Sequence, residues 1–265
     1  MLPTWESKFE LKPGVWVFVP TRESVEEGNI VKGALSDRWK PPKNYFHLRS
    51  GGHVKALELH RNNTVFVHLD IQDFFGSIGK SRVTRNLKGF FSYEEARAIA
   101  TKSTVTHPDS GSLILPFGFV QSPILASLCL AKSALGLHLQ ALPQKYAGLA
   151  VSVYVDDIIL SSHYEADLVS ATAELKEISA RSRFILNPNK EQGPAHRITA
   201  FNVVLSNLQL EIEQNRYDRF VAAFNNSENG SQREGIFSYV ASINMAQAVQ
   251  LEQAYKGEKT KGPTI

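Results

Sequence analysis

The spacing of apolar and polar positions changes along the chain and predicts where its strands lie. Residues 64–71 (TVFVHLDI) are rich in β-branched and aromatic side chains and contain no glycine, which is typical of a strand. Residues 149–162 (LAVSVYVDDIILSS) form two apolar halves around an acidic pair, which predicts two strands joined by a turn. Residues 196–207 and 208–214 predict a closing hairpin. Residues 1–62 show no clear period and are rich in Gly, Pro and charge, so we expect them to be irregular.

Other segments carry helical signals. Ser92 is followed three residues later by Glu95, which is the signature of a capping box. Ser122 and Pro123 supply an N-cap and a first-turn proline ahead of a long apolar run. Helices and strands alternate without the regular spacing of a β-sandwich, so the expected fold class is α+β. The four predicted helices are 91–100, 122–142, 166–182 and 235–255.

Composition restricts the protein class. A chain of 265 residues is long enough for one or two domains, and 21% charged with 10% aromatic residues argues against global disorder. The single cysteine, Cys129, excludes an internal disulfide and a cysteine-rich zinc site, which fits a reducing compartment. The N-terminus lacks the pattern of a secretory signal, and the most apolar stretch, 113–137, is interrupted by Gln121 and Lys132. We therefore expect a cytoplasmic protein with no membrane partner.

Positive charge is unevenly distributed, although the net charge is only +3. Residues 32–61 contain seven Lys or Arg against Asp37 and Glu58, with aromatic residues interleaved. That pattern suits a nucleic-acid contact surface, and it fits a solvated, loop-rich lobe about equally well. A second basic run at 80–102 is more typical of one solvated helix face.

The acidic pair Asp156–Asp157 is the strongest local anomaly. Two adjacent carboxylates between apolar strand halves repel each other and are costly to bury without a cation. An ordinary acidic β-turn is the simpler alternative. Asp70, however, ends a second apolar strand, so side-by-side strands would bring three carboxylates together. Mg²⁺ binds through such oxygen ligands, and two ions about 4 Å apart can activate a hydroxyl and stabilise a leaving phosphate oxygen.

The segment between these acids, ILPFGFVQSPILASL, carries a weaker signal. Gly118 permits close backbone approach, and the helix that starts near Ser122 points its N-terminal N–H groups at a potential anion. A structural turn before a core helix explains the segment nearly as well.

Taken in order, these motifs resemble those of reverse transcriptases over residues 64–212. YVDD matches the family's tyrosine-x-aspartate-aspartate signature, and four further segments follow the family order. The terminal GIFSYVASINM is similar to retron enzymes and favours a prokaryotic, defence-associated subgroup. The matching segments are HLDIQDFFGSI, LPFGFVQSPILASL, YVDD, LNPNK and ITAFNVVLSN.

The resemblance implies a right-hand polymerase fold: a palm of antiparallel sheet backed by helices, with fingers and a reduced or atypical thumb. The implied domains are a fingers-like region at 1–63, a palm with interleaved fingers elements at 64–212, a thumb-like helical region at 213–255 and a disordered tail at 256–265. The implied activity is RNA-directed DNA synthesis, a nucleotidyl transfer of dNTPs to a 3′-hydroxyl.

It also assigns roles to the acidic residues. Asp70, Asp156 and Asp157 would hold two Mg²⁺ ions, with Mn²⁺ as a possible substitute and the carbonyl of Ile71 as a further ligand. Lys190, which ends LNPNK, would protonate the departing pyrophosphate, although a lone surface lysine is the commoner explanation.

Around the acids, Phe75 falls at the family's steric gate and would exclude ribonucleotides, unless it and Phe74 are simply core aromatics. Tyr154, Phe201 and Asn202 would lie near the primer and template, with core packing as the competing role of Tyr154.

The nucleotide contacts depart from the family pattern. Phe117 stands where the family usually has Gln, next to Gly118, and Gln121 lies three residues further on. Either Gln121 takes over the polar contact to the nucleotide, or the base is positioned differently. The basic fingers motif is not recognisable. Arg49, Lys55 and Arg61 are the available candidates for the triphosphate.

The expected partners are an RNA template or non-coding RNA, the DNA product and dNTPs. Because the thumb would be reduced, we also expect a partner protein or self-association. Two alternatives stay open: template-independent or protein-primed synthesis by the same site, and a catalytically silent RNA-binding subunit of a defence complex.

Overall fold

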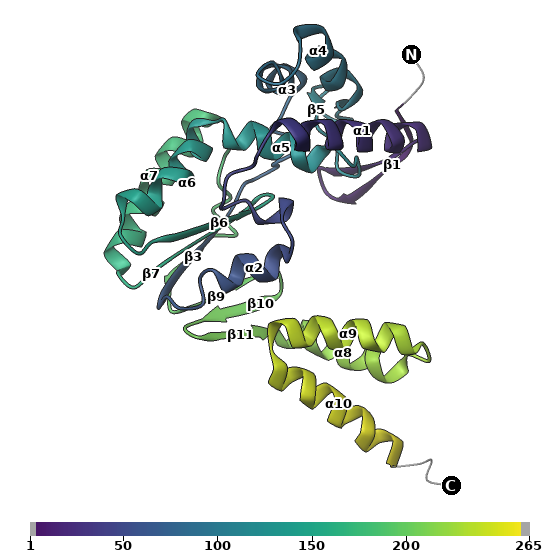
Figure 1. Ribbon diagram of the computed structural model, residues 1–265, viewed down its shortest axis with the longest axis vertical. Coiled ribbons are helices and arrows are strands. Elements are labelled where there is room, and N and C mark those ends of the chain that lie inside the picture. The colour runs from purple at the N-terminus through teal and green to yellow at the C-terminus, as the bar shows by residue number, and fades with distance from the viewer. Residues whose placement is uncertain (1–3, 261–265) are drawn as a thin grey trace.

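A four-stranded antiparallel sheet organises the protein, with strand order β6-β7-β3-β8 (Figure 1). The structure is a computed structural model that describes residues 4–260, with side chains up to residue 255. The strands predicted at 64–71 and on either side of the acidic pair are confirmed. The strands are β3 (Val65–Asp70), β6 (Ala150–Tyr154), β7 (Asp157–Ser162) and β8 (Gln192–Ala195).

Helices α6 (Ala134–Lys145) and α7 (Glu165–Ser182) pack against each other and against the sheet (Figure 1). Ahead of them, α5 (Ser122–Ala131) ends where a single helix to residue 142 was predicted, so that prediction was wrong. Ser133 breaks the run because its hydroxyl accepts a hydrogen bond from the N–H of Gly136 and starts α6 at an angle of 66° to α5.

The predicted N-cap of α5 was also wrong. Gln121 occupies the N-cap position and makes no side-chain capping bond, while Ser122 is the first helical residue. Pro123 does stand in the first turn, as predicted.

The N-terminal region is regular, which corrects the expectation of an irregular segment. Hairpin β1 (Trp5–Lys12) and β2 (Val15–Pro20) leads into α1 (Arg22–Arg38), which is capped by the Thr21 hydroxyl. The 3-10 helix η1 (Phe46–Leu48) and α2 (Gly52–Glu58) follow. In α1, only Ser24, Gly28 and Leu35 are buried, and just one of these three residues is a large apolar one. The sequence of α1 therefore lacks the apolar stripe by which an amphipathic helix is predicted.

Between β3 and α5 lie two helices and a short hairpin. Helix α3 (Lys80–Leu87) precedes α4 (Tyr93–Lys102), and the capping box predicted at Ser92 and Glu95 is present in full. The hairpin consists of β4 (Val105–Thr106) and β5 (Leu113–Ile114).

The C-terminal part forms a second sheet, which lies next to the main sheet, and three helices, which lie at the opposite end of the long axis from α1 (Figure 1). The predicted helix 235–255 is divided at Asn244, whose side chain bonds the Leu210 carbonyl and the N–H of Gln247. The strands are β9 (Arg197–Ala200), β10 (Val203–Ser206) and β11 (Gln209–Ile212). The helices are α8 (Gln214–Asn226), α9 (Gly230–Ile243) and α10 (Met245–Thr260).

The tail expected at 256–265 falls partly on this last helix, because α10 continues through Thr260. Residues 261–265 lie outside the described part of the chain.

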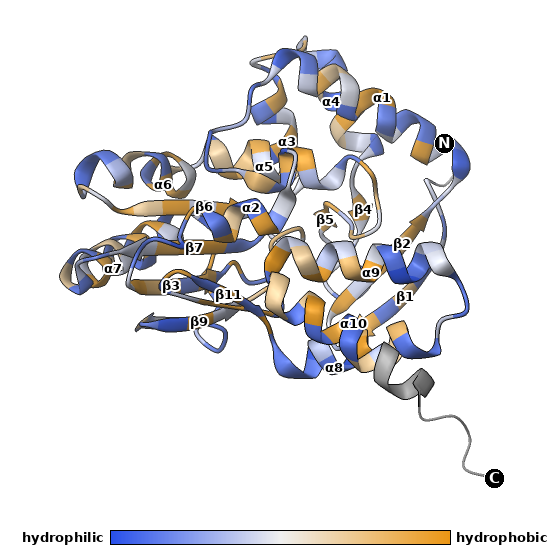
Figure 2. Ribbon diagram, turned by 60° about the horizontal axis from the view of Figure 1, so that its bottom comes forward, coloured by the Kyte–Doolittle hydropathy of each residue, from blue (hydrophilic) through white to orange (hydrophobic). Residues whose placement is uncertain are grey.

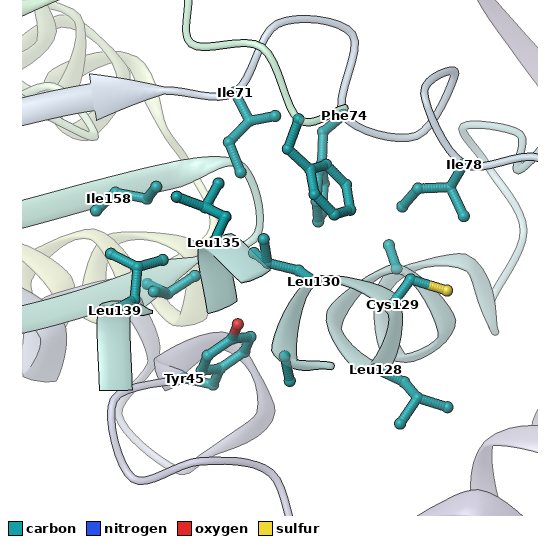
Figure 3. Packing of buried hydrophobic residues seen from close by; sticks show 14 of the residues in the cluster. Tyr45, Ile71, Phe74, Ile78, Leu128, Cys129, Leu130, Leu135, Leu139 and Ile158 are labelled. Carbon is teal, nitrogen blue, oxygen red and sulfur yellow. The ribbon is translucent and has the colours of Figure 1, made fainter. Parts of the chain in front are cut away.

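Two main hydrophobic clusters hold these parts together. The larger packs the sheet against α5, α6 and α7; its members Ile71, Phe74, Leu130 and Leu135 meet in Figure 3. The second joins the C-terminal sheet and helices to the main sheet through Phe66 and Ile159. In Figure 2, β6 and α5 are coloured largely as hydrophobic, whereas hydrophilic residues are interspersed along α1.

Within the described residues, no single helix has the length and apolarity needed to cross a membrane. The bent pair α5 and α6 reaches that threshold only when its two helices are taken together. The fold class is α+β, as predicted.

Candidate active site

Strand register brings the three predicted acids to one end of the sheet. Asp70 and Asp157 are directly opposite each other in the antiparallel pair of β3 and β7. Asp156 lies in the two-residue turn between β6 and β7, after Val155, whose φ is 59°. The N–H of Ile71 donates to the Asp156 carbonyl at 2.9 Å, which ties this turn to the end of β3. The three acids predicted to converge therefore do so.

The turn is held from outside by His47, a residue that sequence reasoning missed. The Val155 N–H donates to Nδ1 of His47 at 3.2 Å. Nε2 of His47 lies 2.6 Å from the Ser127 hydroxyl, which donates to the Pro123 carbonyl. Burial lowers the pKa of His47 to about 4, so the ring is neutral, with Nδ1 accepting and Nε2 donating. No local signal marks this histidine, since its partners are far away in the sequence.

His68 is a second missed residue. Its Nε2 lies 2.7 Å from a carboxylate oxygen of Asp157, and its ring is buried. Nδ1 of His68 faces the Gln192 amide at 3.5 Å, and that amide is fixed by two 2.8 Å hydrogen bonds with the backbone of Thr199. The sequence could have indicated this residue, because His68 lies two positions before Asp70 and residues two apart on a strand share a face of the sheet.

Lys190 supplies the positive charge next to the acids. Its Nζ lies 2.5 Å from a carboxylate oxygen of Asp70, whose residue is 4% exposed. The N–H of Asn187 donates to the Asp70 carbonyl at 2.8 Å and so anchors the loop that carries Lys190. The hydrogen bond to Asp70 raises the pKa of Lys190. The structure thus brings Lys190 to the site, where sequence alone left a surface lysine as the commoner explanation.

The electrostatics favour a bound cation. Burial, and then the neighbouring carboxylate of Asp157, raise the pKa of Asp156 to about 6. Within residues 4–255, no three His, Cys, Asp or Glu side chains are grouped so as to enclose a metal ion. Mg²⁺ commonly takes one or two protein carboxylates and completes its shell with waters and substrate phosphates. The donor set fits a cation shared with a nucleotide.

Two adjacent phenylalanines lie beyond the acids. Phe75 packs edge-on against Phe117 with ring centroids 4.7 Å apart, and Phe74 packs against Phe184 at 5.8 Å. Both Phe74 and Phe75 are buried, so each ring has a packing role (Figure 3 shows Phe74). The steric-gate role of Phe75 stays a prediction.

In the segment 116–123, which we call the PFG segment, Gly118 and Gln121 pack against parts of the chain away from the acids. Gly118 has a φ of +103°, and a Cβ there would lie 2.2 Å from the carbonyl oxygen of Phe18. Gln121 is buried and its amide donates to the Ser103 hydroxyl at 3.2 Å. The special geometry of the segment serves contacts with β2 and with Ser103, which caps the C-terminus of α4. These contacts do not support the predicted nucleotide role of Gln121.

The three basic candidates are dispersed. Arg61 donates to the Leu208 carbonyl at 2.9 Å and precedes β3, whose other end carries Asp70. Lys55 pairs with Glu58 on α2 at 2.6 Å. Arg49 lines a separate cavity. The structure does not bring these side chains together.

The predicted primer-side residues do meet. Tyr154 and Phe201 pack edge to face at 5.1 Å, and His53 contacts both rings. The His53 ring also bonds the Tyr239 hydroxyl at 3.1 Å, which joins α2 to α9. Phe201 and Asn202 both have positive φ and form the turn between β9 and β10. This aromatic cluster connects the YVDD turn to the C-terminal helices.

Comparison with known proteins identifies the family of this chain. Residues 29–209 match the family described as reverse transcriptase (RNA-dependent DNA polymerase), and the chain belongs to that family. The α+β fold is accordingly that of a polymerase palm with its helices.

Solved structures with the same fold include two from distant proteins. Telomerase from Candida albicans, in complex with a fragment of telomeric RNA, superposes with a TM-score of 0.57 at 9% identity; the match covers 90% of this chain and 54% of that one. A foamy viral protease-reverse transcriptase in complex with double-stranded DNA gives a TM-score of 0.51 at 14% identity, covering 88% and 35%. The chain therefore spans about half or less of the length of these structures.

Proposed function

We propose that the chain is an RNA-directed DNA polymerase that adds dNTPs to a 3′-hydroxyl. The observation that carries this function is the register of β3 and β7, which places Asp70 opposite Asp157 with Asp156 in the adjoining turn. In a member of the reverse transcriptase family, these carboxylates would bind the metal ion, and the metal ion would in turn bind the nucleotide phosphates.

The residues of the site would have different roles in the reaction. Asp70, Asp156 and Asp157 would bind Mg²⁺, and when bound the metal would lower the pKa of the attacking hydroxyl and offset charge on the phosphate oxygens. His68 holds the Asp157 carboxylate in one orientation through its 2.7 Å contact. Contact with Asp70 keeps Lys190 protonated at Nζ, and Lys190 would give that proton to the departing pyrophosphate.

Selection of the sugar is assigned to Phe75. We expect Phe75→Ala to relax discrimination against ribonucleotides because the ring would no longer block a 2′-hydroxyl. Phe74→Ala is the matched control, since it removes a neighbouring buried ring of the same kind. Both variants should lose about 3–5 kcal/mol of stability from the cavity they create, but only Phe75→Ala should change the ratio of rNTP to dNTP incorporation. Equal ratios in the two variants would remove the assignment.

Within the family, we place the chain in the prokaryotic, retron-like branch, acting in antiphage defence with an associated non-coding RNA. The segment GIFSYVASINM, which forms part of α9 and the start of α10, supports this placement by its resemblance to retron enzymes.

The test is extension of a DNA primer annealed to an RNA template, by the full chain purified with its co-expressed nucleic acid, with Mg²⁺ and all four dNTPs. We expect the product sequence to follow the RNA. Products independent of the template, or DNA attached to the protein, would replace the proposal with template-free or protein-primed synthesis. No incorporation by a protein that binds RNA would replace it with a silent RNA-binding subunit.

A further inference from the structure

Helix α3 is flanked by two neighbouring cavities that contain only basic and neutral side chains. The first, of about 630 Å³, lies between α3, the junction of α5 and α6, and the C-terminal end of α7. The second, of about 400 Å³, lies between α3 and α4 and shares Ser81 and Arg85 with the first. Within the part of the chain that the structure describes, no Asp or Glu lines either cavity. We call the two together the basic groove; its cations are Lys80, Arg82, Arg85, Lys88, Arg97, Lys132, Arg181 and Arg183.

The charges in the groove are largely uncompensated. Of its cations, all within the described part of the chain, Arg181 is the one that pairs with a carboxylate, at 3.3 Å from Glu177. Burial lowers the pKa of Arg82, and the nearby guanidinium groups of Arg183 and Arg85 lower it further. Gathering like charges without an anion is unfavourable, so a bound polyanion would relieve the repulsion.

Arg82 is held rigidly in the groove and has an unused donor. Its guanidinium lies over the Phe184 ring, 4.3 Å from the centroid, and Nη2 donates to the Ser182 carbonyl. Among the described residues, Nη1 of Arg82 has no hydrogen-bond partner, but that atom is itself buried, so a ligand would meet the part of the guanidinium that lines the groove. A fixed guanidinium of this kind is well suited to a phosphate oxygen.

Arg183 occupies a conformation that favours glycine. It caps the C-terminus of α7 with a φ of 57°, in the left-handed region where an arginine side chain costs energy. An arginine at this position, with its side chain lining the groove, is consistent with a role for the side chain rather than for the backbone.

The groove is extended rather than a single pocket. It follows α3, whose eight residues span about 12 Å, so it is long enough for several consecutive phosphates. Ser81, Asn86 and Ser133 add neutral donors of the kind that contact phosphate and sugar. Tyr93, which is 53% exposed and lines the second cavity, offers a ring on which a base can stack.

We propose that the basic groove binds the phosphate backbone of an RNA at a position separate from the carboxylates of the polymerase site. None of Asp70, Asp156 and Asp157 lines either cavity. A nucleic acid fits better than a lipid surface because Tyr93 is the one large exposed apolar side chain among the lining residues. Only the choice of RNA over DNA rests on the proposed function.

The test is binding of a fluorescent hairpin RNA, measured by anisotropy at several salt concentrations, without nucleotide or metal. The variant Arg85→Gln/Lys88→Gln/Arg183→Gln removes three exposed charges from the groove. We expect its RNA affinity to fall at least about tenfold and the slope of log affinity against log salt to decrease by about 2, since each phosphate contact contributes about 0.7–0.9. Because no catalysis is involved, a chain that fails as a polymerase still answers the question.

A matched variant controls for the loss of net charge. Lys12→Gln/Arg22→Gln/Arg197→Gln removes the same charge from exposed positions outside the groove. Its affinity should stay within about twofold of the wild type. Equal affinity and equal salt slope in the two variants would overturn the proposal.

Cross-linking gives a second readout that does not depend on substitutions. RNA carrying 4-thiouridine should cross-link to peptides from α3 and α4 of the unaltered protein. Cross-links confined to other parts of the chain would overturn the proposal. So would a groove variant that loses binding to phosphatidylglycerol vesicles while keeping its RNA affinity.

Discussion

The carboxylate end of the main sheet and the PFG segment both carried predicted functional residues, and the structure treats them differently. At the sheet end, Asp70 and Asp157 lie opposite each other, and Lys190 contacts the Asp70 carboxylate. In the PFG segment, Gly118 packs against Phe18 and Gln121 bonds Ser103, so its distinctive residues serve packing.

The difference has a physical cause. Convergence at the sheet end follows from strand register, which is fixed by local apolar patterns and by a tight turn. The role of the PFG segment depends on which elements pack against it, and those elements, β2 and α4, were not recognisable as its neighbours in the sequence. A motif is therefore informative about chemistry only as far as its partners are also known.

The largest expected effect concerns Gly118. Gly118→Ala should destabilise the protein by several kcal/mol, because the new Cβ meets the Phe18 carbonyl oxygen and φ is unfavourable. Gly14→Ala is the control: its φ is +78° but it has open space around it, so it should cost only about 1 kcal/mol. Denaturant unfolding measures both. Equal losses would show that the close contact with β2 is not what requires glycine.

The next prediction concerns the pH dependence of stability that the Asp156 carboxyl causes at the sheet end. In metal-free protein, the pKa of Asp156 is raised from 3.8 to about 6, so the native state binds more protons than the unfolded state between these values. Stability from this group is then greatest below pH 3.8 and is lost as pH rises through about 6. Asp156→Asn should match the wild type at the acid end and exceed it by at most about 3 kcal/mol above pH 6.

Unfolding measured in chelator across this pH range checks the prediction. Asp218→Asn, at an exposed carboxyl on α8, is the control for the loss of one carboxylate charge. A stability gain from Asp156→Asn that is the same at every pH would contradict the account of this carboxyl.

His47 allows a finer test of how the sheet end is held. Asn at position 47 can place an acceptor near that of Nδ1 and keep the bond to Val155, whereas Gln can place a donor near that of Nε2 and keep only the bond to Ser127. We expect His47→Gln to lower kcat about tenfold, which corresponds to the free energy of one hydrogen bond. His47→Asn should keep most of the wild-type kcat because it keeps the bond to Val155. The midpoint temperature of thermal unfolding should shift by a similar amount in both variants. Equal kcat values would remove the positioning role.

The smallest effect is expected at Gln121. Gln121→Met keeps the volume of a buried side chain whose Oε1 has no hydrogen-bond partner, so stability should change by less than about 1.5 kcal/mol. The KM for dNTPs should stay within about twofold of the wild type. A large rise in KM with unchanged stability would show that Gln121 contacts the nucleotide after all and would break the comparison.

Sequence patterns predicted what strand and helix periodicity can reveal. The strands that carry Asp70 and Asp157, the turn at Asp156 and the capping box at Ser92 follow from local composition. The helix breaks at Ser133 and Asn244 were not predicted, because the apolar pattern continues through both positions. Each break depends on a hydrogen bond made by one side chain, the hydroxyl of Ser133 or the amide of Asn244.

The supporting residues of the site could not be predicted in the same way. His47 and His68 act through partners 80 and 89 residues away, at Ser127 and Asp157. The basic groove likewise assembles from α3, α4, the α5–α6 junction and the end of α7, which are separate in the sequence. Such sites depend on tertiary contacts.

The most direct test of the central claim is single-nucleotide incorporation by Asp70→Asn, Asp156→Asn and Asp157→Asn, measured with saturating Mg²⁺ and dNTP. Asp73→Asn, three residues beyond the strand-end acid Asp70, is the control. We predict that the first three lose about a thousandfold or more in rate, as expected for several kcal/mol of lost stabilisation, while the control stays within about tenfold of the wild type. Folded variants of the first set that retain the wild-type rate would contradict the assignment of the strand-end carboxylates as the catalytic centre.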